Sequence, residues 1–108
     1  MNKETLVNVG GRMKFCPSEI ILLESDINYT RLHFADGSVI LTSINLGKLE
    51  PRFISFNFFR PNRSCIINLD FMANYEKETA SIRMENNETI QLSRRRVKQF
   101  INISNQSL

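Results

Sequence analysis

Residues 28–34 alternate between two faces and are followed, after Ala35, by Asp36-Gly37, a combination that restricts the fold more than any other feature of this sequence. In an extended chain successive side chains point to opposite sides, so the even-numbered residues of this stretch share one face and Tyr29 lies on the other. Asp-Gly is a strong signal for a two-residue turn between antiparallel strands. The Val-Ile-Leu run at 39–41 supplies the returning strand. This part of the chain is therefore predicted to form an antiparallel β-hairpin.

Short strand-like segments divided by turn residues recur along most of the chain. Besides the two above, they are predicted at 6–9, 13–16, 20–23, 56–59, 65–69, 71–75, 80–84 and 89–92. The longest uninterrupted apolar run is Ile20–Leu23, far too short to cross a membrane. With 108 residues the chain is long enough for one modest hydrophobic core and short for two. We expect a mainly β fold with short helices, in one domain over residues 1–108 with its core at about 7–103.

Two stretches change to the 3–4 spacing that is typical of an α-helix. One is Ser43–Glu50, where Ser43 is placed as the N-cap and Pro51 or the residues after it are expected to end the helix or bend its last turn. The other is a C-terminal helix over 94–101, with Ser93 as its cap.

The two cysteines, Cys16 and Cys65, follow an N-terminus that carries an acid early and lacks the apolar core of a signal peptide. Two lone cysteines in such a chain are more often small buried apolar residues in a reducing compartment than a disulfide. We therefore expect a cytoplasmic protein with no membrane partner.

Positive charge is segregated into two segments that contain no Asp or Glu. Residues 51–69 and 89–108 together hold Arg52, Arg60, Arg63, Arg94, Arg95, Arg96 and Lys98. These segments carry +7, so the rest of the chain carries −4 within the total of +3. Such segregation favours a polyanionic partner.

The stretch from Arg60 to Ser64 is flanked by apolar residues on both sides. Because Pro61-Asn62 is not expected to continue a strand ladder, the stretch is predicted to be a rigid turn that projects Asn62 and Arg63 outward, with both arginines unpaired. Arg and Asn are the side chains that read guanine and adenine edges through paired hydrogen bonds. Two basic segments in one small domain favour nucleic-acid binding over a structural role.

Three consecutive arginines begin the C-terminal helix, although the N-terminal end of a helix disfavours cations. The run indicates a negative partner near the free backbone N–H groups, with a merely solvated charged face as the plainer alternative. Successive helical residues point about 100° apart. With Val97, Phe100 and Ile101 facing inward, Arg95 is expected to point outward and its two arginine neighbours to flank the inward face.

No arrangement of residues supports catalysis or a metal site. The single histidine, His33, and the two cysteines lack neighbours at ligand spacing. Gly10-Gly11 is a lone turn rather than a phosphate loop, and no serine lies in a nucleophile elbow. We expect no enzymatic activity and no cofactor.

Several separated motifs match one known family. The stretches FFRPNRSCIINLD at 58–70 and IQLSRRRVKQF at 90–100 resemble the LytTR DNA-binding domain of bacterial response regulators. The matching positions are Phe58, Arg60, Arg63, Ser64, Asn68, Ser93, Arg94 and Arg95. Upstream, the family order is also followed by Ile20–Glu24, Asn28-Tyr29, Asp36-Gly37 and Ser43–Leu49.

The likeness extends from about Val7 to Phe100, with two departures. The family's usual histidine before Arg-Ser is Asn62 here, preceded by Pro61, so the base preference at this position need not follow the family. Most LytTR domains follow a receiver domain, for which this chain has no room. Its initiating methionine and domain-sized length favour a stand-alone regulator over a part of a longer protein.

The resemblance implies small antiparallel sheets packed side by side, with loops rather than a recognition helix entering the major groove of DNA. It implies base contacts from Tyr29, from the turn with Asn62 and Arg63, and from Arg95. Contacts to the DNA backbone are expected from Ser43, Arg60, Ser64, Arg94, Arg96 and Lys98.

The expected partner is double-stranded DNA with repeated half-sites, bound by a bacterial transcriptional regulator; no small-molecule substrate is expected. A homodimer on the DNA is compatible with this expectation, although the sequence leaves the oligomeric state open. One alternative, an OB-like single-strand binder, needs aromatic stacking platforms on a solvated strand face, which Tyr29 alone clearly offers. The other is a protein-interaction module that docks an acidic partner, which a salt-dependent preference for duplex DNA would exclude.

Overall fold

The computed structural model describes residues 5–106 of the chain. The strands are β1 (Val7–Gly10), β2 (Met13–Phe15), β3 (Ile20–Asp26), β4 (Tyr29–Phe34), β5 (Val39–Thr42), β6 (Phe58–Asn62), β7 (Cys65–Asn68), β8 (Met72–Glu76), β9 (Ser81–Met84) and β10 (Thr89–Gln91). The α-helices are α1 (Leu46–Phe53) and α2 (Arg94–Gln106), and short 3₁₀ turns lie at Pro17–Glu19, Ile54–Phe56 and Leu69–Phe71.

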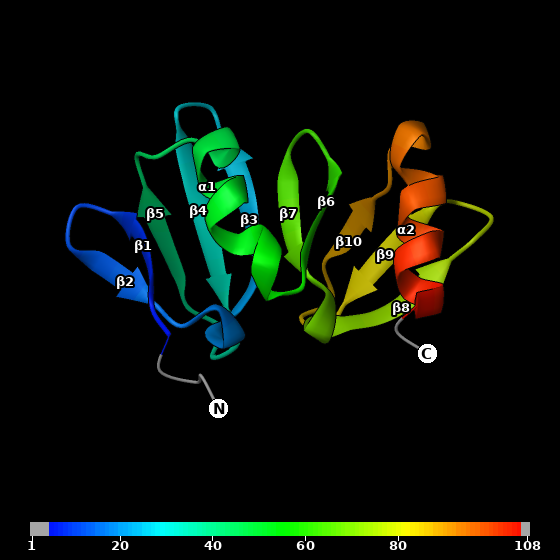
Figure 1. The fold of residues 1–108 in the computed structure, drawn as a ribbon, viewed down its shortest axis with the longest axis horizontal. Coiled ribbons are helices and arrows are strands. Elements are labelled where there is room, and N and C mark those ends of the chain that lie inside the picture. Colours follow the sequence, from blue (N-terminus) through cyan, green and yellow to red (C-terminus); the bar gives the residue numbers. More distant parts are fainter. Residues whose placement is uncertain (1–4, 107–108) are drawn as a thin grey trace.

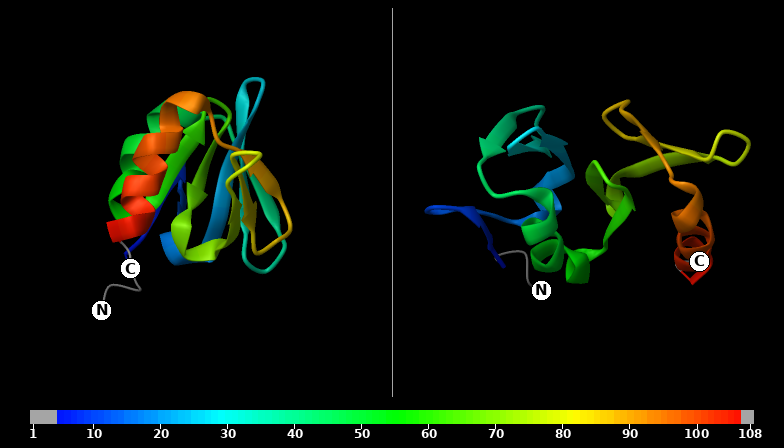
Figure 2. Two further views of the ribbon diagram at one scale, coloured as in Figure 1. Left: turned by 90° about the vertical axis from the view of Figure 1, so that its right-hand side faces the viewer. Right: turned by 90° about the horizontal axis from the view of Figure 1, so that it is seen from above.

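The strands form three small antiparallel sheets that stand side by side (Figure 1). The largest has the order β5-β4-β3-β7-β6, the second has the order β10-β9-β8, and β1 pairs with β2 in a separate hairpin. Seen from above, the β6–β7 hairpin stands between α1 and α2 (Figure 2). The predicted mainly β fold, with small sheets and a C-terminal helix, is confirmed.

The buried apolar side chains of residues 5–106 divide into two clusters on opposite faces of the five-stranded sheet, the first on the side of α1 and the second on the side of α2. The expectation of a single core was therefore wrong. The cause lies in β3, where Ile20 and Leu23 belong to the cluster beneath α1, while Ile21 and Leu22 belong to the cluster beneath α2. A bulge between Ile20 and Leu22 shifts the register at this point. A short continuous apolar run is what a strand that is buried on both faces requires.

The predicted alternation along β4 is confirmed. Thr30, Leu32 and Phe34 are buried, whereas Tyr29 is 51% exposed. The period of two in the sequence therefore reports correctly which face of β4 packs against the first cluster.

Helix α1 has Asn45 as its N-cap, whose side chain accepts a hydrogen bond from the backbone N–H three residues on at 2.9 Å. The assignment of Ser43 as the cap was therefore wrong; serine and asparagine are both favoured cap residues, and the sequence offered both within three positions. Pro51 lies inside the helix, which ends at Phe53 and tightens into the 3₁₀ turn Ile54–Phe56. The helix thus ends shortly after its proline.

Strand β6 runs through Pro61 and ends at Asn62, so the prediction of a turn at these two residues was wrong. Proline is tolerated here because β6 is an edge strand and because a bulge between Phe59 and Asn62 interrupts the ladder. Asn62 pairs with Cys65, so the turn itself consists of residues 63–64.

Helix α2 continues past the predicted 94–101 and is held to the second cluster by Phe100, which is 1% exposed. The ring centroid of Phe100 lies 5.8 Å from that of Phe59 in β6 and 4.9 Å from that of Tyr75 in β8. The predicted inward face is confirmed, since Val97 and Ile101 also pack against this cluster. No helix in the described residues is long and apolar enough to cross a membrane.

Candidate nucleic-acid interface

Four connections lie along one edge of the molecule, at the top of Figure 1. They are the β3–β4 turn (27–28), the segment between β5 and α1 (43–45), the β6–β7 turn (63–64) and the start of α2 (93–96). Antiparallel pairing brings the first three to the same edge, and β10 delivers α2 beside them. We call these connections the loop edge. Most of the side chains predicted to contact DNA belong to it or to the adjoining strand ends.

Two backbone hydrogen bonds hold the β6–β7 turn against its neighbours. Ser25 N–H donates to the Ser64 carbonyl at 2.8 Å, which joins the turn to the end of β3. Ser93 N–H donates to the Pro61 carbonyl at 2.9 Å, which joins β6 to the start of α2. Because these bonds are between backbone atoms, the hairpin and the helix have a defined relative position.

The side chain of Asn62 is half-buried and is engaged within the protein, rather than projecting outward as expected. Its Oδ1 accepts hydrogen bonds from Ser64 N at 2.7 Å and from Cys65 N at 3.1 Å. Its Nδ2 donates to the carbonyl of Gln91 in β10 at 2.6 Å. The side chain therefore closes the turn by an Asx-type arrangement and ties it to the three-stranded sheet.

Arg60 is paired, although the sequence predicted two unpaired arginines in this stretch. Its Nη1 lies 2.8 Å from Glu50 Oε1 in α1, and the two side chains are only 19% and 30% exposed. Its Nε and Nη2 donate to the carbonyls of Asn62 and Arg63 at 3.2 and 2.8 Å. Glu50 lies one residue outside the acid-free segment 51–69, so the charge pattern of that segment could not predict the ion pair between Arg60 and Glu50.

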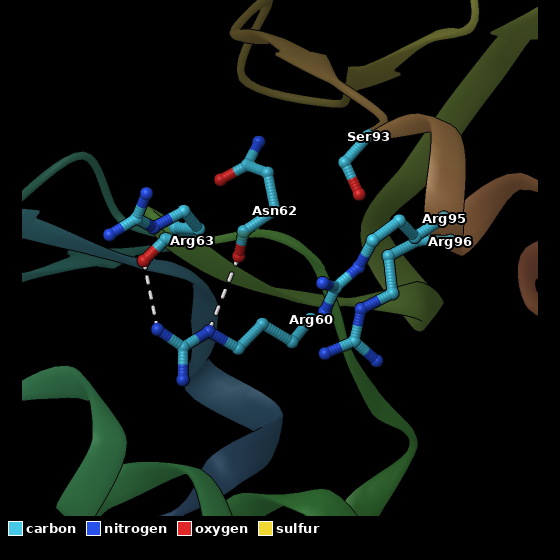
Figure 3. A pocket seen from close by; sticks show the side chains of 6 residues that line it. All are labelled: Arg60, Asn62, Arg63, Ser93, Arg95 and Arg96. Atoms are coloured by element: carbon cyan, nitrogen blue, oxygen red, sulfur yellow. Dashed lines mark hydrogen bonds between the residues drawn. The ribbon is translucent and has the colours of Figure 1, made fainter.

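A cleft of about 390 Å³ separates the β6–β7 hairpin from the start of α2 (Figure 3). It is lined by Arg60, Asn62, Arg63, Ser93, Arg95 and Arg96. The side chains of Arg95 and Arg96 extend from the helix toward the hairpin, whereas Arg63 extends away from the helix (Figure 3). The fold thus brings together the two basic segments that are some thirty residues apart in the sequence.

Arg63, Arg94, Arg95 and Lys98 are exposed, in keeping with a role in binding, and Arg96 is half-buried. No ion pair is formed by these five cations within residues 5–106; Arg96 donates to Gln99 Oε1 at 3.1 Å. Arg94 does not line the cleft.

The remaining candidates, Tyr29, Ser43 and Ser64, are also exposed. Tyr29 begins β4, directly after the β3–β4 turn, and the two serines lie in the other connections of the loop edge. The structure therefore gathers most of the predicted site residues at one edge of the molecule.

Gln91 and Glu50 belong to this region but were not among the candidates. The backbone carbonyl of Gln91 receives the Asn62 amide, and Glu50 receives Arg60. A backbone carbonyl accepts hydrogen bonds whatever the side chain of its residue, so the sequence does not reveal the role of Gln91. Glu50 could have been found only by recognising that α1 packs beside β7 and brings the acid to the hairpin.

Cys65 begins β7 directly after the turn and is buried with a free thiol. Burial raises the pKa of this thiol to about 12, the Glu24 carboxylate adds to the rise, and Asn62 and Arg60 oppose it in part. The thiolate is the reactive form of cysteine. Cys65 is therefore a packing residue rather than a nucleophile.

His33 and Arg31 in β4 are half-buried and lie beside acidic side chains of β3. His33 Nε2 lies 2.9 Å from Glu24 Oε1, and Arg31 lies 3.6 Å from both Glu24 and Asp26. Within residues 5–106, no three His, Cys, Asp or Glu side chains are grouped so that they could hold a metal ion.

Comparison with a solved structure shows the same fold in another protein. The LytTr DNA-binding domain of a methyl-accepting/DNA response regulator from Bacillus cereus superimposes with a TM-score of 0.70, covering 89% of this chain and 91% of that one at 19% sequence identity. The likeness therefore covers most of both chains rather than a single motif.

Comparison of sequences leads to the same family. The sensory transduction protein LytT of Oceanobacillus iheyensis is 33% identical over 66 residues, which cover 60% of this chain and 27% of that protein. The chain thus spans about a quarter of the length of this relative. The sequence model of the LytTr DNA-binding domain matches residues 10–105. LytTR domains are DNA-binding modules rather than enzymes. Since nearly the whole chain is matched, it belongs to the LytTR family of DNA-binding domains.

Proposed function

We propose that this chain binds double-stranded DNA in a sequence-specific manner and regulates transcription. The observation that carries the proposal is the cationic cleft at the loop edge, where Arg95 and Arg96 from α2 face a hairpin that presents Arg63. Guanidinium groups bind phosphates and read guanine through paired hydrogen bonds. Membership of a DNA-binding family supports the same conclusion.

Duplex DNA is favoured over single strands by the burial of the aromatic side chains. All ten Phe and Tyr residues lie in the described part of the chain, and Tyr29 alone among them is exposed. A single-strand binder uses several exposed rings on which successive bases stack. One exposed ring beside several free arginines is better suited to a duplex, whose bases are already stacked.

Two arginines are proposed to read bases in the major groove, and their neighbours to hold the backbone. Arg63 stands exposed on a turn that hydrogen bonds fix on both sides, and Arg95 is exposed at the start of a helix anchored by Phe100. A fixed backbone presents each guanidinium from a defined position, which lowers the cost of ordering on binding. Tyr29 is a third candidate for a base contact.

Asn62 is proposed to shape the turn rather than to read adenine. A base contact from its amide requires the bonds to Ser64, Cys65 and Gln91 to break. Arg60 likewise orders the turn through the carbonyls that it binds. Contacts to DNA phosphates remain proposed for Ser43, Ser64, Arg94, Arg96 and Lys98, and for the part of Arg60 that faces the cleft.

We further propose that the DNA site consists of repeated half-sites, that a second copy of the chain can occupy the neighbouring half-site, and that the protein acts in the cytoplasm. A single loop edge contacts only a short DNA segment. Repetition of the site is the simplest way in which a domain of this size reaches the specificity that a regulator needs.

The test is the salt dependence of affinity for duplex DNA. If about five phosphates are neutralised, the expected slope of log affinity against log salt concentration is about −4 to −5. Lys77→Ala, which removes an exposed cation in the β8–β9 turn, is the matched control and should leave the slope unchanged. A slope shallower than about −2, or equal affinity for a single strand of the same sequence, would contradict the proposal.

A further inference from the structure

Ile27 occupies an unusual position at the tip of the β3–β4 turn. Asp26 pairs with Tyr29, so the turn consists of Ile27 and Asn28 alone. The Ile27 side chain is 94% exposed, the highest value among the large apolar residues that the structure describes as exposed. Its backbone has a φ of 56°, in the left-handed region.

This conformation is unfavourable for isoleucine. A positive φ is readily adopted by glycine and tolerated by asparagine, but for a β-branched residue it is a genuine outlier. The other positive-φ residues of the described chain are Asn57, Ala80, Asn87, Gly10, Gly11 and Gly37, none of which is β-branched. Asn28, a residue type better suited to the left-handed region, stands at the next position of the same turn.

The fold gives no reason for isoleucine at this position. Ile27 belongs to neither hydrophobic cluster, so its side chain adds nothing to the core. It places apolar surface in water and holds its backbone in a strained conformation. Strain of this kind persists mainly where a residue serves a function. We therefore infer that the Ile27 side chain makes an apolar contact with a binding partner.

The position of the turn indicates what that contact is. The β3–β4 turn is part of the loop edge, and the Ser25–Ser64 hydrogen bond fixes the end of β3 beside the hairpin that carries Arg63. The major groove is wide enough to admit a two-stranded β-ribbon. Within it, the apolar group that a base presents is the C5 methyl of thymine.

We propose that Ile27 contacts the C5 methyl group of a thymine in the major groove. The proposal rests on the proposed function, because it requires that the loop edge binds duplex DNA. It adds an apolar reader of A·T pairs to the arginines, which read guanine. Specificity at that base pair then depends on one methyl group on the DNA and one branched side chain on the protein.

The experiment pairs a change in the protein with a change in the DNA. A duplex selected from random sequences by the purified chain is remade with each thymine in turn replaced by deoxyuridine, which lacks only the methyl group. At one position the wild-type protein should lose affinity about three- to fivefold, as expected for burial of one methyl group. Ile27→Gly should bind the unmodified duplex more weakly and should show no further loss at that position.

Two controls keep the result unambiguous. Glycine adopts a positive φ without strain, so Ile27→Gly should unfold at the same temperature as the wild type or higher, and weaker binding cannot be ascribed to unfolding. Val39→Ala changes another exposed apolar residue, at the start of β5, and should keep the full response to deoxyuridine.

Each other outcome overturns the inference. If the wild type responds to deoxyuridine at no position, or if Ile27→Gly responds as the wild type does, Ile27 does not read a methyl group. If Ile27→Gly loses affinity equally for all duplexes and bends DNA less, Ile27 is a wedge between bases rather than a reader. A protein that shows no preference for duplex over single-stranded DNA would instead overturn the proposed function.

Discussion

Arg60 Nη1 lies 2.8 Å from Glu50 Oε1 and joins helix α1 to the hairpin that presents Arg63. The same guanidinium binds two carbonyls of the hairpin, so a single side chain links α1 to the loop edge. The sequence suggests that Arg60 is unpaired and contacts DNA, but most of its hydrogen-bonding capacity is used within the protein. Arg60 therefore stabilises the hairpin, whereas Arg63 and Arg95 are the arginines proposed to contact DNA bases.

Arg60→Ala is expected to lower the free energy of unfolding by about 2 kcal/mol, because hydrogen bonds to a half-buried charged group are lost and the Glu50 carboxylate is left without its partner. Arg63→Ala is the matched control on the same hairpin. Since the Arg63 side chain is exposed and forms no ion pair, its removal should change stability by less than about 0.5 kcal/mol. Urea denaturation of the two variants measures the difference. Equal stability of the two variants would show that Arg60 has no structural role.

Glu50→Gln should loosen the hairpin while leaving α1 intact. The variant keeps the shape of the side chain and one acceptor but loses the charge that holds Arg60. We expect a modest loss of stability, about 1 kcal/mol, and a smaller ratio of specific to non-specific DNA affinity, because Arg60 then acts as an additional free cation. Binding to the selected duplex and to an unrelated duplex gives the ratio. An unchanged ratio would mean that the pair does not control the hairpin.

Phe100→Ala should detach the start of α2 from the second cluster. Removal of a fully buried phenylalanine costs about 3–5 kcal/mol of stability, and here it also removes the ring contacts with Phe59 and Tyr75. Affinity for DNA should fall with stability because Arg95 and Arg96 lose their fixed position. Phe100→Leu, which retains most of the volume, should restore both. If Phe100→Leu regains stability but does not regain affinity for DNA, the packing of Phe100 is not sufficient to place α2 for DNA binding.

Cys65 should make the protein less stable at high pH. The folded-state pKa of this thiol, about 12, lies above the unfolded value near 9, so the unfolded chain releases its proton first. The stabilising difference is therefore complete below about pH 9 and is lost as the pH rises toward 12, by up to about 1.4 kcal/mol per pH unit. Denaturation of the wild type and Cys65→Ala between pH 7 and 11 should show stability falling more steeply in the wild type. Parallel curves would contradict the raised pKa.

Much of the fold could be predicted because its signals are local. The alternation along β4, the hairpin at Asp36-Gly37 and the 3–4 spacing in α2 each depend on neighbours within a few residues, and each was confirmed. The turn of that hairpin is longer than the predicted two residues, because Phe34 N–H donates to the Ser38 carbonyl and Ala35 joins the loop. The errors arose where several residues suit one role or where tertiary context decides. Ser43 and Asn45 are both good caps, and Pro61 is acceptable in a strand only because β6 lies at an edge.

The sequence predicted where the candidate site lies, but it did not predict the hydrogen bonds and the ion pair between its residues. Basic segments without acids indicate where a polyanion can bind, and the fold brings these segments together. The partners of Asn62 and Arg60 come from Gln91 and Glu50, and no local pattern reveals such pairs. The strain at Ile27 is likewise invisible in the sequence, because it depends on which residue of the turn takes the positive φ.

The central claim, that the loop edge reads bases, is tested most directly by the sequence motif that each arginine variant selects from random duplex DNA. Arg63→Ala and Arg95→Ala should each flatten the motif at a different base pair, with a loss of about 1–3 kcal/mol at that position. Arg94→Ala and Arg96→Ala should lower affinity for all sequences alike and reduce the salt slope by about one unit each, with the motif unchanged. If Arg63→Ala and Arg95→Ala weaken specific and unrelated duplexes equally, the loop edge only clamps the DNA backbone and the claim is wrong.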